Sequence, residues 1–147
     1  MYSFLYFILV NFNENETMNR FSEFLNERGQ LLLEIAKIGE IDNFEVIIWT
    51  NDSGRIPHVH IVNPEFDCCV RLDKPEYFKH GHHEDTLNSR QRKAFYEFMC
   101  STQEEGDTLT NYEFAVRNWN TNNSDTKIKI PRDDTGRVII PDYRLLP

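Results

Sequence analysis

The chain has 147 residues, of which 39% are hydrophobic and 13% aromatic, enough to bury the core of one domain. Eleven Phe, six Tyr and two Trp exclude a disordered chain, and the formal net charge of −8 disfavours binding to nucleic-acid phosphates. An odd count of three cysteines excludes a disulfide framework and is typical of a reducing cytoplasm. We therefore predict a single cytoplasmic domain, residues 1–147, with a protein partner and no membrane association.

The first 17 residues differ in character from the rest of the chain. The apolar stretch Tyr2–Val10 is too short to cross a bilayer, and it lacks the positive flank and cleavage site of a signal peptide. A second methionine, Met18, follows a polar stretch. One hypothesis is that translation begins at Met18 and that residues 1–17 are a mis-called extension; the alternative is a strand added at a sheet edge.

The next segment is predicted to be a helix from about Asn19 to Gly39. Gly29 interrupts it, because glycine weakens a helix interior. The prediction rests on apolar residues at helical intervals on both sides of this glycine: Phe21, Phe24, Leu25, Leu31, Leu32, Ile35 and Ile38.

Three strand patterns follow the helix. Residues 44–50 form a compact β-branched run, which is typical of a strand buried on both faces. Residues 56–62 and 66–72 are two further strands, separated by the turn residues 63–65. Together with the helices, these strands predict an α+β fold: a small antiparallel β-meander of three or more strands with helices packed on one face.

The second half of the chain contains two helix patterns and a tail. Asn88 is the expected N-cap of the first helix, and Gln91 three residues later completes a capping box. Thr108 is the expected cap of the second helix. Residues 121–147 are polar and rich in turn residues, so they predict an irregular tail with two short strand candidates: 126–130 and 137–140.

The short turn between the second and third strands fixes a register. Pairing Val62 with Asp67 gives one face made only of apolar pairs, which must be the core face. The second face then carries two polar pairs: His60 opposite Cys69 and His58 opposite Arg71. We expect this second face to be accessible to a ligand, with any cover coming from the N-terminal helix or the C-terminal tail.

All five histidines lie between residues 58 and 83, and this concentration indicates a functional site. Imidazole and thiolate are the ligands that zinc and similar divalent metals take in proteins, and three or four must converge. His58 is the poorer ligand because the neighbouring Arg71 cation repels a metal ion. The metal candidates are His60, Cys69, His80, His82 and His83.

A catalytic interpretation uses the strand histidines directly. In a metal-dependent enzyme, His58 and His60 act as ligands or as a general base, and His80, His82 or His83 completes the site. In a metal-free variant, His58 and Arg71 contact phosphate in an RNA. Two alternatives stay open. The strand histidines fit a half-buried hydrogen-bonding role equally well, and the polar segment from His80 to Asp85 fits a solvated, mobile loop.

The segment Pro57–Ile61, with the apolar strand Cys68–Leu72 and the helix end Ala94–Met99, resembles a family of short prokaryotic domains of unknown function. That family is marked by a P-P-H-[FV]-H-V strand, and its members often lie near toxin–antitoxin-type gene pairs. The resemblance covers residues 44–100, with Ile56 in place of the first proline. It implies a small cytosolic α+β domain with His58 and His60 as its signature, but no reaction.

Three functional hypotheses follow from these observations. The first is a protein-interaction or regulatory module of toxin–antitoxin or phage/mobile-element type, because no complete catalytic constellation can be assembled. The alternative is a metal-dependent hydrolase or nuclease-like enzyme that uses the histidine cluster 58–83. In the third, His58 and His60 only hold the strands in register.

Overall fold

The computed structural model describes residues 35–49, 56–81 and 83–147. Its elements are, in chain order, β1 (Ile35–Ile41), β2 (Phe44–Trp49), β3 (His58–Asn63), β4 (Phe66–Arg71), α3 (Ser89–Cys100), α4 (Asn111–Asn122) and the 3₁₀ turns η2 (Ser124–Thr126) and η3 (Tyr143–Leu145). Within these ranges, no helix has the length and apolar character needed to cross a membrane.

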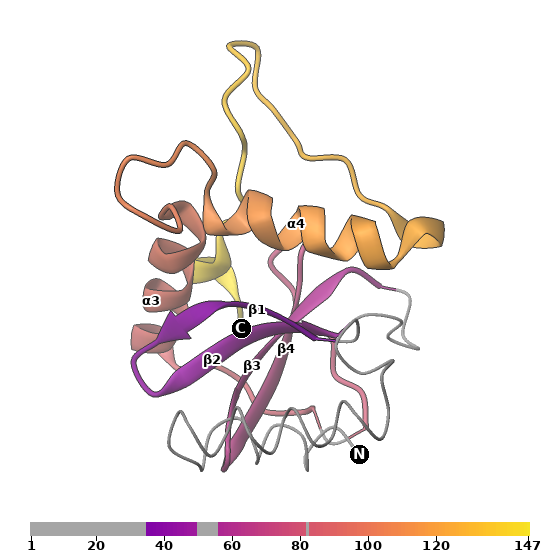
Figure 1. Ribbon diagram of the computed structural model, residues 1–147. Helices are drawn as coiled ribbons and strands as arrows, with labels where there is room; N and C mark the ends of the chain where they lie inside the picture. The colour runs from indigo at the N-terminus through magenta and orange to yellow at the C-terminus, as the bar shows by residue number, and fades with distance from the viewer. Residues whose placement is uncertain (1–34, 50–55, 82) are drawn as a thin grey trace, which may run out of the picture.

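The four strands form one antiparallel sheet in the order β1-β2-β3-β4, so each strand pairs with the next along the chain. In Figure 1, α4 lies across one side of this sheet, with α3 and the C-terminal η3 beside it. The predicted α+β meander with helices on one face is confirmed.

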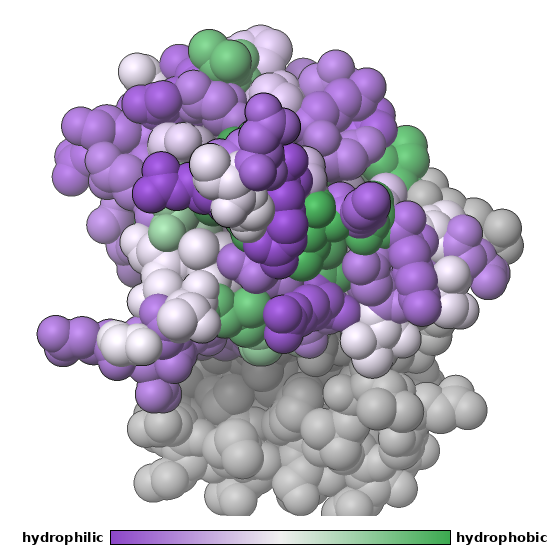
Figure 2. Space-filling view, turned by 90° about the horizontal axis from the view of Figure 1, so that it is seen from above, coloured by the Kyte–Doolittle hydropathy of each residue, from purple (hydrophilic) through white to green (hydrophobic). Residues whose placement is uncertain are grey.

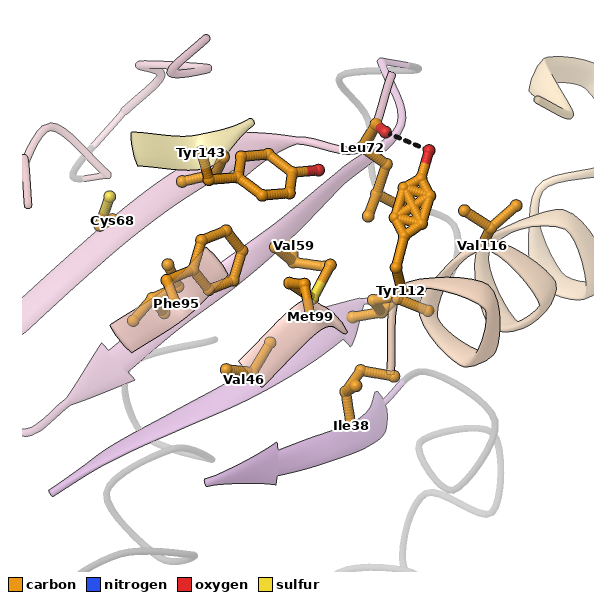
Figure 3. Packing of buried hydrophobic residues seen from close by; sticks show 14 of the residues in the cluster. Ile38, Val46, Val59, Cys68, Leu72, Phe95, Met99, Tyr112, Val116 and Tyr143 are labelled. Carbon is orange, nitrogen blue, oxygen red and sulfur yellow. Dashed lines mark hydrogen bonds between the residues drawn. The ribbon is translucent and has the colours of Figure 1, made fainter. Parts of the chain in front are cut away.

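The hydrophobic core lies between one face of the sheet and the two helices. Figure 3 shows Phe95 and Met99 of α3 packed near Val46 of β2 and Val59 of β3. Each of these four side chains is almost completely buried, as expected for the apolar face of a meander covered by amphipathic helices.

Two tyrosine hydroxyls attach the helical layer and the tail to the end of β4. The Tyr112 hydroxyl of α4 donates to the carbonyl of Leu72 at 2.8 Å, the dashed line in Figure 3. The Tyr143 hydroxyl of η3 donates to the carbonyl of Arg71 at 2.9 Å. Because both tyrosines are buried, these bonds satisfy polar groups that water does not reach.

The helix predicted to end at Gly39 is wrong over residues 35–39, which belong to β1. A bulge between Lys37 and Gly39 shifts the register against β2, so the strand lacks the strict two-residue alternation that would reveal it. A Cβ on Gly39 would lie 2.7 Å from the Phe98 ring, so glycine permits this close approach. Predicted features within residues 1–34, including the extension 1–17, lie outside the described residues.

The helix starts are confirmed in one case and corrected in the other. The capping box of Asn88 and Gln91 is present at the start of α3. The N-cap of α4 is Thr110, not Thr108, and its hydroxyl accepts from the backbone N–H of Glu113.

Neither strand predicted in the tail forms. The side-chain amide of Asn120 accepts from the backbone N–H of Ile128 and donates to its carbonyl, so a side chain takes the place of a strand partner. Further along, Arg132 and Val138 make only an isolated bridge. The regular elements of residues 121–147 are the end of α4 and the 3₁₀ turns η2 and η3.

Candidate metal site

The histidine-bearing face of the sheet has the register that the sequence predicts. His60 pairs with Cys69 and His58 pairs with Arg71, whereas Val59 pairs with Val70 on the core face. The expectation of an accessible face is wrong, because His58, His60 and Cys69 are each only 1% exposed.

The cover of this face comes partly from a segment of the chain that follows β4. The rings of Phe78 and His80 lie 5.0 and 5.4 Å from the ring of His58. Trp119, near the end of α4, contacts the same histidine at 5.4 Å. The expected cover from the N-terminal helix concerns residues outside the described ranges.

Backbone hydrogen bonds hold the segment 76–85 along the outer edge of β4. Phe78 N–H donates to the carbonyl of Cys69 at 2.9 Å, and Asp85 N–H donates to the carbonyl of Asp67 at 3.2 Å. The Asp85 carboxylate also accepts from the N–H of Asp67. These bonds fix Phe78 and Asp85 against β4, whereas Gly81, Glu84 and Asp85 are exposed, as expected for a solvated loop. His82 lies outside the described residues.

Four ligating groups converge on this face from β3, β4 and the segment 76–85: His58, His60, Cys69 and His80. One ligand atom from each lies within 4.8 Å of the others. The Nε2 atoms of His58 and His60 are 3.1 Å apart, and Cys69 Sγ is 3.7 Å from His60 Nε2. We call these four residues the inner set.

In each histidine of the inner set, Nδ1 faces an oxygen atom. His58 Nδ1 contacts the carbonyl of Ile56, and His80 Nδ1 contacts the carbonyl of Phe78 at 3.0 Å. His60 Nδ1 lies 3.5 Å from Asp67 Oδ1. Stacking on Phe78, with ring centroids 4.3 Å apart, further orients His80. Such partners on the second ring nitrogen are usual for histidines that bind metal through Nε2.

A second, overlapping group of ligands consists of His60, Asp67, Cys69 and His83, here called the outer set. His83 Nδ1 lies 2.5 Å from Asp67 Oδ2, and Cys69 Sγ lies 3.1 Å from His60 Nδ1. The side chain of Asp67 is 29% exposed and that of His83 is 12% exposed, so the outer set lies closer to solvent than His58.

The Asp67 carboxyl is held in its charged form. Burial opposes its ionisation, but attraction to His60 and His83 prevails and keeps its pKa below the usual value. Within the described part of the chain, Asp67 Oδ1 and His83 Nδ1 are buried atoms without an aligned hydrogen bond. Buried polar atoms of this kind are rare and call for a partner such as an ion.

The two adjacent cysteines have opposite environments. Cys68 points into the core, and burial raises its thiol pKa to about 12, so it is an inert apolar side chain. Cys69, on the other face, contacts His60. The alternation of the strand therefore selects one of two neighbouring thiols as a ligand.

The candidate Arg71 is engaged away from the histidines. Its guanidinium forms a bidentate pair with Asp73 at 2.7 and 2.9 Å and approaches Glu76 at 3.8 Å. These carboxylates offset the cation that made His58 a poor ligand in the sequence interpretation, and the structure includes His58 in the inner set.

Sequence reasoning did not select Asp67 as a ligand. The information was present, because Asp67 precedes Cys69 by two residues and so lies on the same strand face. No protein-family model matches the chain, and neither a curated protein nor a solved structure matches it.

Proposed function

We propose that this chain is a transition-metal-binding regulatory or protein-interaction module, in which one zinc ion is bound by His58, His60, Cys69 and His80. The proposal rests on the convergence of one ligand atom from each of these four residues. Nδ1 of His58 and Nδ1 of His80 each contact a backbone carbonyl, and Nδ1 of His60 lies 3.1 Å from Cys69 Sγ and 3.5 Å from Asp67 Oδ1. Three nitrogens and one thiolate are a familiar ligand set for zinc.

Two of the distances within the inner set are compatible with tetrahedral coordination. Ligand atoms bound at 2.0–2.3 Å around a tetrahedral ion are separated from one another by about 3.3–3.7 Å. The separations of 3.1 Å between His58 Nε2 and His60 Nε2, and of 3.7 Å between His60 Nε2 and Cys69 Sγ, are close to this range.

A metal-free hydrogen-bond network is the competing interpretation. If His58 Nδ1–H donates to Ile56 and His60 is neutral, then His60 Nε2–H donates to His58 Nε2, and the Cys69 thiol donates to His60 Nδ1. The unprotonated Nδ1 would then face the Asp67 carboxylate at 3.5 Å without a proton between them. Protonation of His60, or an ion on Nε2, removes this conflict, because His60 Nδ1 then carries a proton that points toward Asp67.

The closed character of the inner set favours a structural or regulatory ion over a catalytic one. A catalytic zinc usually keeps three protein ligands and one position for water, whereas a structural zinc is bound by four protein ligands and sealed. The inner set supplies four ligands, of which three are 1% exposed. This argues against the metal-dependent hydrolase that the sequence left open.

The surface gives the module no broad apolar docking face on the side that carries α4. Figure 2 shows this side as mainly hydrophilic, with hydrophobic residues in small separate areas. Among the described residues, the exposed large hydrophobic side chains are Ile139 and Leu145. A partner on this side would therefore be recognised through polar contacts, and the toxin–antitoxin or phage context is proposed on the sequence resemblance alone.

The test is metal analysis of protein purified without a histidine tag. We expect about one zinc per chain, and we expect Co²⁺ substitution to give the visible bands of a tetrahedral site with a thiolate ligand. His60→Ala and Cys69→Ala should each abolish this binding. The matched control is Cys68→Ala, which removes the neighbouring thiol from the core and should retain the metal. A wild-type chain that stays metal-free under zinc and manganese titration would exclude the proposal.

A further inference from the structure

We infer that Asp67 and His83 form a loading site, through which a metal ion from solvent reaches the buried inner set. The inference rests on the proposed zinc site and concerns how that site is filled. It starts from a problem of access, because His58, His60 and Cys69 are each 1% exposed and an ion must pass other groups before it reaches them.

The outer set offers a route because it shares two ligands with the inner set. Cys69 Sγ lies 3.1 Å from His60 Nδ1 and 3.7 Å from His60 Nε2, so the thiolate reaches an ion on either side of this ring. The members that belong to the outer set alone, Asp67 and His83, are the more exposed ones. An ion can therefore keep the thiolate as a ligand while the inner histidines replace Asp67 and His83.

The charge and position of Asp67 and His83 favour capture of a cation. Asp67 places its carboxylate between two imidazoles, with Oδ1 3.5 Å from His60 Nδ1 and Oδ2 2.5 Å from His83 Nδ1. A partly buried negative charge concentrates cations locally and accelerates their association. Asp67 Oδ1 and His83 Nδ1 are among the buried side-chain atoms of the described residues that lack an aligned hydrogen bond, so an ion would displace only the close contact between His83 Nδ1 and Asp67 Oδ2.

A loading site changes rates and leaves the final complex unaltered. Because uptake and release follow the same path in opposite directions, removing His83 should slow both and should leave affinity and final ligands unchanged. Asp67 also faces His60 Nδ1 in the loaded site, so its removal should slow uptake and also weaken affinity, with the same final ligands. Electrostatic capture accelerates association by about 10-fold or more, which sets the expected size of the effect.

The experiment measures Co²⁺ uptake by metal-free protein in a stopped-flow spectrometer and Co²⁺ release to EDTA. His83→Ala should slow both steps about 10-fold or more, and Asp67→Asn should slow uptake by a similar factor, each with one Co²⁺ bound and the wild-type absorption bands at the end point. The control is Glu84→Gln, which removes an exposed carboxylate from the same segment, outside both sets, and should keep wild-type rates.

Three results would overturn the inference. Wild-type rates in both loading variants would show that the ion takes another path. Altered end-point bands would show that Asp67 and His83 are permanent ligands, and two ions per wild-type chain would show that the sets are filled together. A wild-type chain that binds no Co²⁺ would instead refute the zinc site itself, so the two failures are distinguishable.

Discussion

Removal of the metal should lower the stability of the protein by several kcal/mol. An ion bound by the inner set joins β3 to β4 and β4 to the segment 76–85, which closes two stretches of about a dozen residues each: 58–69 and 69–80. In the cross-link model, closing a loop of this length stabilises the folded state by about 3 kcal/mol. The two loops together give an upper bound of about 6 kcal/mol, which is within the binding free energy of a structural zinc ion.

Thermal unfolding followed by circular dichroism measures this effect. For a chain of this size, 1 kcal/mol corresponds to a change in Tm of about 3–4 °C, so zinc-loaded protein should unfold about 10–20 °C above EDTA-treated protein. His80→Ala removes the ligand that closes the second loop, 69–80, so this variant should lose about half of the metal-dependent increase in Tm. Cys69→Ala should lose all of it.

Cys68→Ala provides the control for this experiment. It lowers the Tm of both forms, since a buried core side chain becomes smaller, but it should leave the difference between them intact. The reasoning would be refuted if EDTA changed the wild-type Tm by less than about 3 °C, or about 1 kcal/mol. It would also be refuted if Cys68→Ala, but not Cys69→Ala, removed the metal-dependent increment.

Three further predictions concern residues around the site and the core. Gly39→Ala should lower the free energy of unfolding in urea by about 1–3 kcal/mol, because the added Cβ would meet the Phe98 ring at 2.7 Å; an unchanged midpoint would contradict this packing. Tyr143→Phe should cost about 1–3 kcal/mol in the same assay, since the buried carbonyl of Arg71 loses its donor; a neutral effect would mean that another donor replaces the hydroxyl. The lowered pKa of Asp67 stabilises the fold above the ordinary carboxyl pKa of 3.8, and this contribution disappears as pH falls through the still lower folded value. Asp67→Asn should therefore flatten the acid limb of a stability–pH curve below about pH 4, and an unaltered limb would count against the charged pair.

The pairing of β3 with β4 could be predicted from the sequence, because the turn residues and the alternation of apolar side chains indicate the same register. The turn after Asn63 leaves a register in which Val59 and Val70 share an apolar face, and the same alternation places His60 beside Cys69. In β1, by contrast, the bulge at Gly39 breaks the alternation, and the isoleucines then match a helical spacing. The strand is recognisable only from its pairing with β2, which is a tertiary property.

The ligands of the candidate site also fall into two groups, those that the sequence predicts and those that depend on tertiary structure. The strand ligands follow from register, whereas His80 and His83 reach the site because backbone groups of Cys69 and Asp67 bond to the segment 76–85. Such bonds leave no pattern in side-chain hydropathy. The sequence could therefore indicate only that the histidines lie close to one another along the chain. The partner that orients His80, the carbonyl of Phe78, is likewise a backbone group and could not be anticipated.

X-ray absorption at the zinc K edge counts and identifies the atoms bound to the ion. Coordination by the inner set predicts one sulfur at about 2.3 Å and three imidazole nitrogens at about 2.0–2.1 Å in the wild-type protein. The sulfur shell should be retained in Cys68→Ala. A spectrum without sulfur, or one with fewer than three imidazoles, would contradict zinc coordination by His58, His60, Cys69 and His80.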